Sequence, residues 1–551
     1  METNKSGQFN VVILSLLGLL ILIILFVEVI LCFTPPVARD ALIHHLAIPK
    51  LWLENGRFYE TPWAVYSYYP MNIDLIYLIP LYFKNDIIPN LIHMSFGLGT
   101  ALLIYLYLSN ISGRAAGLLG VLIFISTPII IRMSTVAYVD LGLTFFTTTC
   151  LFSLVRWRNG NYQDNKWLLI ASVTMGLALG TKYNALIAWF FLSLAIVFVY
   201  SRDTKEQVKA IRYGTVFFLV SLLVFSPWLI KNVILTGNPL YPLFQGILNS
   251  GSENSAPSLV SGESSIGIFK TREILYGESF WETLLVPIRF FFQGQDHSDR
   301  FFDGVLNPLL IVFIPFAFIS RSEYRNKVLF LLFACFYIFM AFFLDQLRIR
   351  YFLPAVPLLA VLTVIGLINI FNWAKVKPKI IRYLIFTATL CILTVMIGKN
   401  LFYIKIYFQT IQPINYVFGS ESRDNYIQRH VKSYKAISYI NKNTPPQSRI
   451  KLILLAGRGY YLDRVYEEDA SMGMDIIRRM VEKSGEDRSF RSLLDDLGCT
   501  HLLINMNLFR QFLQNNYHHD DVARLLRQMN KTMEKVYDAE GYSVYKLFHL
   551  E

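Results

Sequence analysis

Long apolar segments alternate with short polar ones over the first 400 residues of the chain. A stretch of roughly 20 apolar residues is long enough to cross a lipid bilayer. The first segment is longer than the apolar core of a secretory signal, and no small-residue cleavage site follows it, so we interpret it as a retained anchor. The pattern predicts about eleven membrane-spanning helices, at residues 11–33, 87–108, 115–131, 139–155, 167–179, 185–200, 216–230, 305–319, 328–344, 352–370 and 383–397.

Shorter segments follow different patterns. Residues 41–53 and 73–83 are typical of amphipathic helices that lie in the plane of the membrane interface. After residue 400, apolar runs at 449–456, 500–506 and 542–547 predict strands, and periodic segments at 434–441, 472–483, 489–497 and 522–533 predict helices. We therefore expect a polytopic α-helical membrane domain over 1–400 and a soluble α/β accessory domain over 401–551.

Composition agrees with this division. Of the 551 residues, 54% are hydrophobic and only 16% are charged, against about 25% charged residues in soluble proteins. The 131 residues from 421 onward nevertheless hold 18 acidic and 20 basic residues. The formal net charge is +12, but no basic stripe interleaved with aromatic residues indicates nucleic-acid binding. A disordered chain is excluded, since such chains are poor in aromatic residues.

The basic residues also predict the orientation of the chain. Loops on the cytoplasmic side of a membrane collect Lys and Arg, and here they gather in alternate loops. This places the N-terminus in the cytoplasm and, with an odd number of spans, the C-terminal domain outside it. We expect a multi-pass protein of the plasma (inner) membrane. Outer loops then cover 34–86 and 231–303, and the polar centre of the second, 250–265, is predicted to be mobile.

Two acidic residues fall at the predicted outer interface. Asp40 follows the first span and opens a predicted helix, with His44 on the same face and His45 next to it. Asp is a favoured helix cap, so Asp40 could simply cap that helix, or it could serve as a general base. Asp140 opens a span, where it is either solvated or faces a functional cavity. The two carboxylates could divide between a base and a metal or substrate ligand.

Three basic residues in short turns on the outer side run against the orientation rule. They are Lys182, Arg348 and Arg350. One interpretation is that they extend to lipid headgroups. The other is that they hold a phosphate, a task suited to Arg and Lys.

Other polar clusters are less specific. Asp296, His297, Asp299 and Asp303 could line an acceptor site or bind a cation, although they lack a standard ligand spacing. The five cysteines suggest neither a disulfide pair nor a structural zinc site. Gly457-Arg-Gly-Tyr-Tyr lacks the spacing of a nucleotide-binding loop, so we expect no nucleotide cofactor.

The order of several short motifs resembles that of the C-type (GT-C) membrane glycosyltransferases, over roughly residues 10–400. Within this group, the sequence is most similar to bacterial relatives of protein O-mannosyltransferases and lipid A aminoarabinose transferases. The motifs are Asp40-Ala-Leu-Ile-His-His, Ser67-Tyr-Tyr-Pro-Met-Asn72, Ala137-Tyr-Val-Asp140, Gly180-Thr-Lys-Tyr183, Thr236-Gly-Asn-Pro-Leu-Tyr-Pro242 and Arg350-Tyr-Phe-Leu-Pro-Ala-Val-Pro357.

The resemblance implies a sugar donor carried on a polyprenyl phosphate at the outer face. It implies that Asp40 is the catalytic carboxylate and that Asp140 shapes an acceptor or metal site. Lys182 and Arg350, which we group with Arg348 and Tyr351, would bind the donor phosphate. Many family members have a second acidic residue directly after the carboxylate that corresponds to Asp40. Here that residue is Ala41, so His44 or His45 could take part of its catalytic role.

The sequence therefore predicts a glycosyltransferase that moves a hexosyl or pentosyl group to a glycan, lipid or protein acceptor of the cell envelope. Positive charge would stabilise the phosphate leaving group, and a lipid-linked donor explains the many spans. A divalent cation remains an open possibility. The alternative is a transporter or lipid flippase, but such proteins place ionisable residues near the bilayer midplane and often contain inverted repeats.

Overall fold

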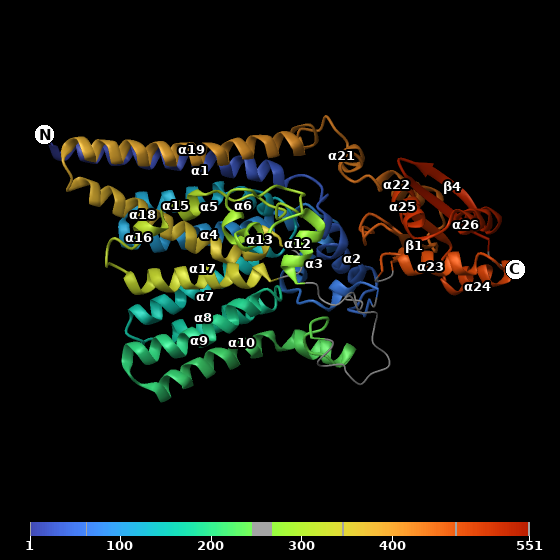
Figure 1. The fold of residues 1–551 in the computed structure, drawn as a ribbon, viewed down its shortest axis with the longest axis horizontal. Coiled ribbons are helices and arrows are strands. Elements are labelled where there is room, and N and C mark those ends of the chain that lie inside the picture. Colours follow the sequence, from blue (N-terminus) through green and yellow to red (C-terminus); the bar gives the residue numbers. More distant parts are fainter. Residues whose placement is uncertain (1, 62, 245–266, 344–346, 469–470, 549–551) are drawn as a thin grey trace.

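The computed structural model describes residues 2–61, 63–244, 267–343, 347–468 and 471–548. The stretch 250–265, predicted to be mobile, lies outside them. A bundle of long helices carries a smaller α/β domain at one end, while the N-terminus lies at the other end (Figure 1). This confirms the predicted fold class of a polytopic helical protein with a C-terminal α/β domain.

Seven helices in the described residues are long and apolar enough to cross a membrane. They are α1 (Glu2–Cys32), α4 (Ile88–Ser112), α9 (Ala185–Thr204), α10 (Gln207–Thr236), α17 (Tyr324–Phe342), α18 (Val356–Lys375) with the turn before it, and α19 (Lys379–Ile411). The helices α5 (Arg114–Ser126) and α6 (Pro128–Ser134), bent by 71°, form an eighth if they are counted as one span.

Two further predicted spans coincide with the helices α7 (Asp140–Asn159) and α8 (Lys166–Leu179), which lie within the bundle (Figure 1). The single helix expected over 305–319 is wrong. That segment forms two short helices, α15 (Leu309–Val312) and α16 (Ile314–Ala317). Pro315 explains the break, because proline has no backbone N–H to continue the hydrogen-bond ladder of α15.

The first long connection holds four short helices: η1 (Ala41–His45), α2 (Ala47–Glu54), η2 (Val65–Tyr68) and α3 (Asn72–Tyr82). The single helix expected over 41–53 is therefore divided. Its first turn is a π-helix in which the Leu46 N–H donates to the Ala41 carbonyl at 3.0 Å. Pro49 removes the N–H that would continue an α-helix from His45, so the chain restarts in α2.

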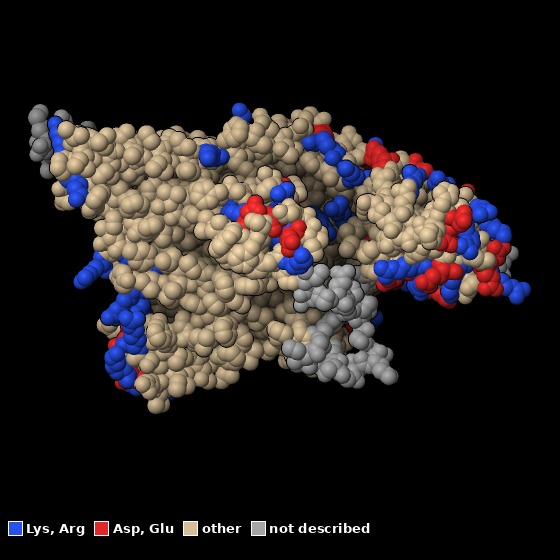
Figure 2. All heavy atoms as spheres, in the orientation of Figure 1, with Lys and Arg blue, Asp and Glu red and all other residues tan. Residues whose placement is uncertain are grey.

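The connection after α10 contains α12 (Ile268–Tyr276), α13 (Phe280–Leu284) and α14 (Val286–Arg289), and η3 (Ile349–Ala355) leads into α18. A capping box between Ser279 and Glu282 fixes the start of α13. Charged side chains are sparse along the sides of the bundle but frequent on the C-terminal domain (Figure 2). This distribution is the one expected when the bundle is surrounded by lipid.

The helix α19 continues past residue 400 to Ile411, and the C-terminal domain follows it. Its sheet has the order β2-β1-β3-β5-β4, with parallel pairing among the first three strands and antiparallel pairing among the last three. The strands are β1 (Arg449–Ile453), β2 (Val465–Glu467), β3 (His501–Asn505), β4 (Met533–Ala539) and β5 (Tyr542–Leu547).

Seven helices accompany this sheet: α20 (Pro413–Val417), α21 (Arg423–His430), α22 (Tyr434–Asn443), α23 (Met474–Lys483), α24 (Asp487–Asp496), α25 (Met506–Asn516) and α26 (His519–Thr532). All three predicted strands and all four predicted helices of the domain are present. The sequence analysis missed the strands β2 and β4 and the helices α20, α21 and α25. The edge strand β4 exposes several residues, so it lacks the apolar run that marks a buried strand.

Specific polar contacts attach this domain to the first connection. Arg423 contacts Asp86 with an Nη2–Oδ2 distance of 2.6 Å, and the Tyr460 hydroxyl donates to the same carboxylate at 3.2 Å. The Lys50 ammonium donates to the carbonyls of Tyr460 and Leu462. The domain therefore lies against the same connection that carries Asp40.

Candidate active site

Asp40 faces a guanidinium group rather than its own helix. Its side chain makes no capping hydrogen bond, and its Oδ2 lies 2.6 Å from Nη2 of Arg350 in η3. Burial by itself raises the pKa of this carboxyl, but Arg350, with smaller contributions from His44 and His45, holds it well below its usual range. The Asp40 backbone N–H donates to the Tyr138 hydroxyl at 3.2 Å. The capping interpretation is thus wrong.

A second ion pair lies beside the first. The Lys182 ammonium is 2.7 Å from Oδ1 of Asp140, whose side chain is only 1% exposed. The Tyr351 ring lies 5.2 Å from Lys182 Nζ and 5.4 Å from the Arg350 guanidinium carbon. These residues come from α7, η3 and the turn after α8. The tertiary structure brings them together around one aromatic ring, and both cations are buried or nearly so instead of extending to lipid headgroups.

The two histidines occupy the space next to these pairs. His45 Nδ1 lies 2.7 Å from Oδ1 of the buried Asp74 in α3, while His44 stacks on Tyr66 with ring centroids 4.5 Å apart. Burial lowers the pKa of each imidazole to about 3, and it raises the pKa of the Asp74 carboxyl. At neutral pH both rings are therefore neutral, and Asp74 orients that of His45.

Two residues that the sequence analysis missed position this site. The buried His93 in α4 receives the Leu141 N–H on Nε2 at 2.9 Å, and its Nδ1 bonds the carbonyls of Met133 and Val136 at 2.8 Å. Its ring thereby ties the end of α6 to the start of α7, where Asp140 lies. No sequence signal marks His93, because a single histidine in an apolar helix has no distinctive pattern.

Asn72 is the other positioning residue. Its backbone N–H donates to the Gly180 carbonyl at 2.8 Å, and its side-chain oxygen accepts from the Trp228 indole at 2.8 Å. These bonds fix the start of α3, which carries Asp74, against the turn that carries Lys182. The motif that ends in Asn72 was recognised in the sequence, but the contact of this residue was not.

The Asp40 side of the site opens into a cavity of about 500 Å³. Its basic lining residues come from distant parts of the chain: Arg39, Arg132, Arg348, Arg350 and Arg458. The Nε atoms of Arg348, Arg350 and Arg458 are buried and have no hydrogen-bond partner among the described residues. Buried guanidinium N–H groups rarely stay unpaired, so the cavity is suited to an anionic ligand.

The aspartates predicted to line an acceptor site or bind a cation, Asp296, Asp299 and Asp303, instead contact arginines of the protein itself. Arg132 Nη1 lies 2.8 Å from a carboxylate oxygen of both Asp296 and Asp303, and the Tyr403 hydroxyl donates to Asp296 at 2.6 Å. Asp299 lies 3.9 Å from Arg348, and the His297 N–H donates to Asp303. These ion pairs hold the connection after α10 against α6 and α19.

The donor groups of the site do not match a metal centre. Among the described residues no three His, Cys, Asp or Glu side chains converge in a way that could hold a metal ion. Asp40 and Asp140, the two carboxylates considered as ligands, each face a cation of the protein itself.

Comparison with protein families identifies one match. Residues 63–236 match the model of the dolichyl-phosphate-mannose-protein mannosyltransferases. This segment contains Asp74, His93, Asp140 and Lys182, while Asp40 and Arg350 lie outside it. A search of the curated proteins found no relative.

Solved structures with a similar fold cover nearly the whole chain. ArnT from Cupriavidus metallidurans in the apo state has a TM-score of 0.52 at 12% identity, covering 98% of this chain and 98% of that one. The same protein bound to undecaprenyl phosphate has a TM-score of 0.52 at 13% identity, covering 96% and 98%.

The oligosaccharyltransferase of Archaeoglobus fulgidus in the apo form has a TM-score of 0.56 at 13% identity, covering 97% of this chain and 74% of that one. The resemblance inferred from the sequence is thereby confirmed: the chain has the fold of the GT-C membrane glycosyltransferases, and its residues 63–236 carry the sequence pattern of the dolichyl-phosphate-mannose-protein mannosyltransferases.

Proposed function

We propose that this protein transfers a sugar from a polyprenyl-phosphate carrier to a hydroxyl of a cell-envelope acceptor, at the outer face of the plasma membrane. The observation that carries the proposal is the convergence of Asp40, Arg350, Tyr351, Lys182 and Asp140 at one end of the bundle. This juxtaposition places a carboxylate next to cations with unused hydrogen-bond donors.

The cations supply the binding site for the donor phosphate. Arg350 uses one nitrogen for Asp40, and its buried Nε has no partner among the described residues. Arg348 Nε is also buried and has no partner among the described residues. Lys182 directs one of its three ammonium protons at Asp140, which leaves two for a ligand. The remaining N–H groups can hold the phosphate in the ground state and stabilise its charge as the bond to the sugar breaks.

Asp40 supplies the base. It takes the proton of the acceptor hydroxyl while the acceptor oxygen bonds to the anomeric carbon, and the carrier phosphate leaves with the electron pair of the broken bond. A single displacement of this kind inverts the anomeric centre. Arg350 makes Asp40 a weak base in the free protein, so a donor phosphate that shares Arg350 also restores basicity to Asp40.

The other acidic and basic groups assist this step. Burial keeps His45 neutral and Asp74 orients its ring beside Asp40, where His45 can accept or relay a proton if the acceptor approaches from its side. Asp140 fixes the Lys182 ammonium. His44, stacked on Tyr66, forms one wall of the site. In this proposal the two histidines assist Asp40. They take part of the role of the second acidic residue that many family members have at the position of Ala41.

Two of the similar structures support the lipid carrier. One is ArnT bound to undecaprenyl phosphate, and another is the archaeal oligosaccharyltransferase AglB in complex with an inhibitory peptide and a dolichol-phosphate. The membrane helices of this chain offer an apolar environment for such a tail. The acceptor we propose is a glycan, lipid or protein of the cell envelope.

The Asp40→Asn substitution tests the role of the base. It keeps the shape of the side chain but removes the base, so sugar transfer should fall at least about a hundredfold. The measurement is mass spectrometry of envelope glycans from cells that lack the protein and are complemented with each variant. Asp164→Asn, in an exposed loop at the other end of the bundle, is the control. Full activity of Asp40→Asn would remove Asp40 from the reaction.

The same variants distinguish catalysis from donor binding. Undecaprenyl phosphate should bind to Asp40→Asn at least as tightly as to the wild type, because Asn no longer competes for Arg350. Arg350→Gln should weaken this binding about tenfold or more. Equal binding by all three proteins, measured with the purified chains in detergent, would contradict the assignment of the phosphate to Arg350.

A further inference from the structure

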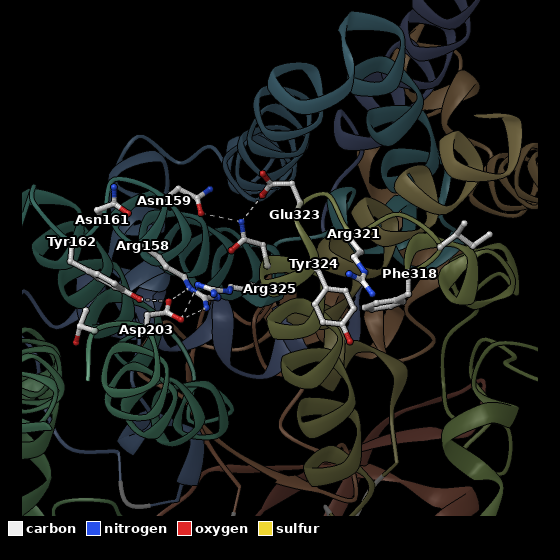
Figure 3. A pocket seen from close by; sticks show the side chains of 13 residues that line it. Arg158, Asn159, Asn161, Tyr162, Asp203, Phe318, Arg321, Glu323, Tyr324 and Arg325 are labelled. Atoms are coloured by element: carbon white, nitrogen blue, oxygen red, sulfur yellow. Dashed lines mark hydrogen bonds and ion pairs between the residues drawn. The ribbon is translucent and has the colours of Figure 1, made fainter. Parts of the chain in front are cut away.

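A second polar hollow lies at the other end of the bundle from the candidate active site. It has a volume of about 1150 Å³ and lies between the ends of α7, α9 and α17 (Figure 3). Lys and Arg side chains gather at this end of the molecule, near the ends of α9 and α10 (Figure 2). By the bias of basic residues, it is the end predicted to face the cytoplasm.

Asp203 organises the basic side chains of this hollow. Its carboxylate accepts two hydrogen bonds from Arg158, at 2.7 and 3.0 Å, and one from the Tyr162 hydroxyl at 2.7 Å. Arg325 contacts it with only one nitrogen, at 3.2 Å. In Figure 3 the side chains of Arg158, Arg325 and Tyr162 converge on Asp203. Arg325 thus keeps most of its donors for a ligand.

An excess of positive charge remains after this pairing. Arg321 also lines the hollow, and Arg202 and Lys205 line the groove that adjoins it. Within the described residues none of these three makes an ion pair. The two acidic residues present, Asp203 and Glu323, do not balance the basic ones, so an anionic group is favoured here.

The adjoining groove is apolar and has a volume of about 650 Å³. It runs between α9 and α17. The two hollows share the lining residues Arg158, Asp203, Tyr324 and Arg325, so they lie side by side. Aromatic and aliphatic side chains make up the groove: Phe190, Phe191, Leu194, Phe198, Leu332 and Phe336.

The helices α9 and α17 contact each other at the end of the groove that is farther from the basic hollow. The Tyr337 hydroxyl donates to the Asn184 carbonyl at 2.9 Å, and Phe191 packs edge-on against Phe333 with centroids 5.6 Å apart. Near the basic hollow, the polar contact between the helices is that of Arg325 with Asp203. The groove thus lies between these two sets of contacts, and the basic hollow adjoins one of its ends.

One acceptor atom in the hollow also requires a partner. Asn326 donates to Asn159 and Glu323, but its Oδ1 is buried and has no hydrogen-bond partner among the described residues. A buried acceptor of this kind normally receives a hydrogen bond. The Tyr107 side chain lies next to Asn326 and can donate that bond.

We propose that this space binds an anionic glycerophospholipid of the membrane, separately from the donor site. The phosphate lies among Arg158, Arg321 and Arg325, and an acyl chain lies in the groove between α9 and α17. Anionic lipids are abundant in the cytoplasmic leaflet, which is the leaflet that this end of the bundle is predicted to contact.

Native mass spectrometry of the purified full-length protein tests the proposal. The probes are dioleoylphosphatidylglycerol and dioleoylphosphatidylcholine, added at equal concentration to the detergent. The wild type should retain the anionic lipid at least about fivefold more than the zwitterionic one. The double variant Arg321→Gln/Arg325→Gln should lose this preference. Arg212→Gln, which removes an exposed basic residue of α10 outside the space, should keep it.

A second pair of variants tests the groove. Leu194→Trp fills it and should reduce retention of the anionic lipid, whereas Leu223→Trp, on the exposed face of α10, should not. The proposal is overturned if both pairs behave alike, since general surface charge or detergent packing would then explain retention. It is also overturned if undecaprenyl phosphate displaces the anionic lipid from the wild type, because the space would then be a carrier site.

Discussion

The charge of each side chain in the candidate site is set by the residue that faces it. Asp40 stays ionised because Arg350 lies against it, and Asp140 is balanced by Lys182. His44 and His45 stay neutral because they are removed from water beside these cations. The site therefore presents two ion-paired carboxylates, spare guanidinium donors and neutral imidazoles, a combination suited to moving a proton next to a phosphate.

His44 makes the stability of the protein depend on pH. Its pKa is lowered to about 3, first by burial and then by His45, whereas in an unfolded chain it is about 6.5. Between these two pKa values the unfolded chain binds a proton on His44 and the folded protein does not. The free energy of unfolding therefore has its full value above about pH 6.5 and decreases as the pH falls toward 3. His44→Gln should therefore lose less thermal stability between about pH 7.5 and about pH 5 than the wild type.

Thermal unfolding in detergent, followed by intrinsic fluorescence, measures this difference. His519→Gln, on the exposed surface of the C-terminal domain, is the control and should follow the wild type. If His44→Gln and the wild type lost the same stability on acidification, His44 would not be held neutral by its surroundings.

At the scale of elements, close contacts between short helices and turns define the site. The turn after α8 approaches the start of α3 so closely that a Cβ on Gly180 would collide with the Asn72 amide. That amide cannot simply move aside, since Trp228 and the Leu177 carbonyl also hold it. Glycine at this position allows Lys182 and Asp74 to lie in one site.

Gly180→Ala should consequently impair both stability and activity. Overpacking of this kind costs about 1–3 kcal/mol, and displacement of Asn72 should also shift Lys182 and reduce sugar transfer. The melting temperature and the glycan assay measure the two effects. Gly398→Ala is the matched control, because a Cβ there would meet no atom within 4 Å. A Gly180→Ala protein as stable and active as this control would contradict the tight contact.

At the scale of the whole molecule, the C-terminal domain completes the site. It lies at the end of the bundle that carries α2 and α3 (Figure 1), and its Arg458 and His430 line the same cavity as Asp40. The contacts of Asp86 with Arg423 and Tyr460 hold it there. The domain therefore forms part of the wall of this cavity.

Asp86→Asn should loosen this attachment. It removes the charge that Arg423 faces, so hydrogen exchange in α21 and around Tyr460 should accelerate about tenfold, which corresponds to ~1.4 kcal/mol. Hydrogen–deuterium exchange with mass spectrometry measures the change. Asp475→Asn disrupts an exposed pair with Arg478 elsewhere in the domain and should leave these segments unchanged. Unchanged exchange in Asp86→Asn would show that other contacts alone hold the domain.

Much of the architecture follows from the sequence by itself. Long apolar segments must form helices in a lipid environment, because their backbone groups find no other hydrogen-bond partners there. Short motifs at the ends of these segments singled out Asp40, Asp140, Lys182 and Arg350. Local patterns were less informative where proline divides a helix, at Pro49 and Pro315, and at the short or exposed strands β2 and β4.

Only the tertiary structure decided which of these groups meet. The pairing of Asp40 with Arg350 joins residues 310 positions apart, and nothing local distinguishes it from capping or from contact with lipid. The partner of His45 is Asp74, and His93 positions Asp140, through contacts between separate helices. Sequence patterns record the periodicity of single segments, whereas ion pairs and cavities arise from the packing of segments against one another, so the chemistry of the site became visible only in the folded chain.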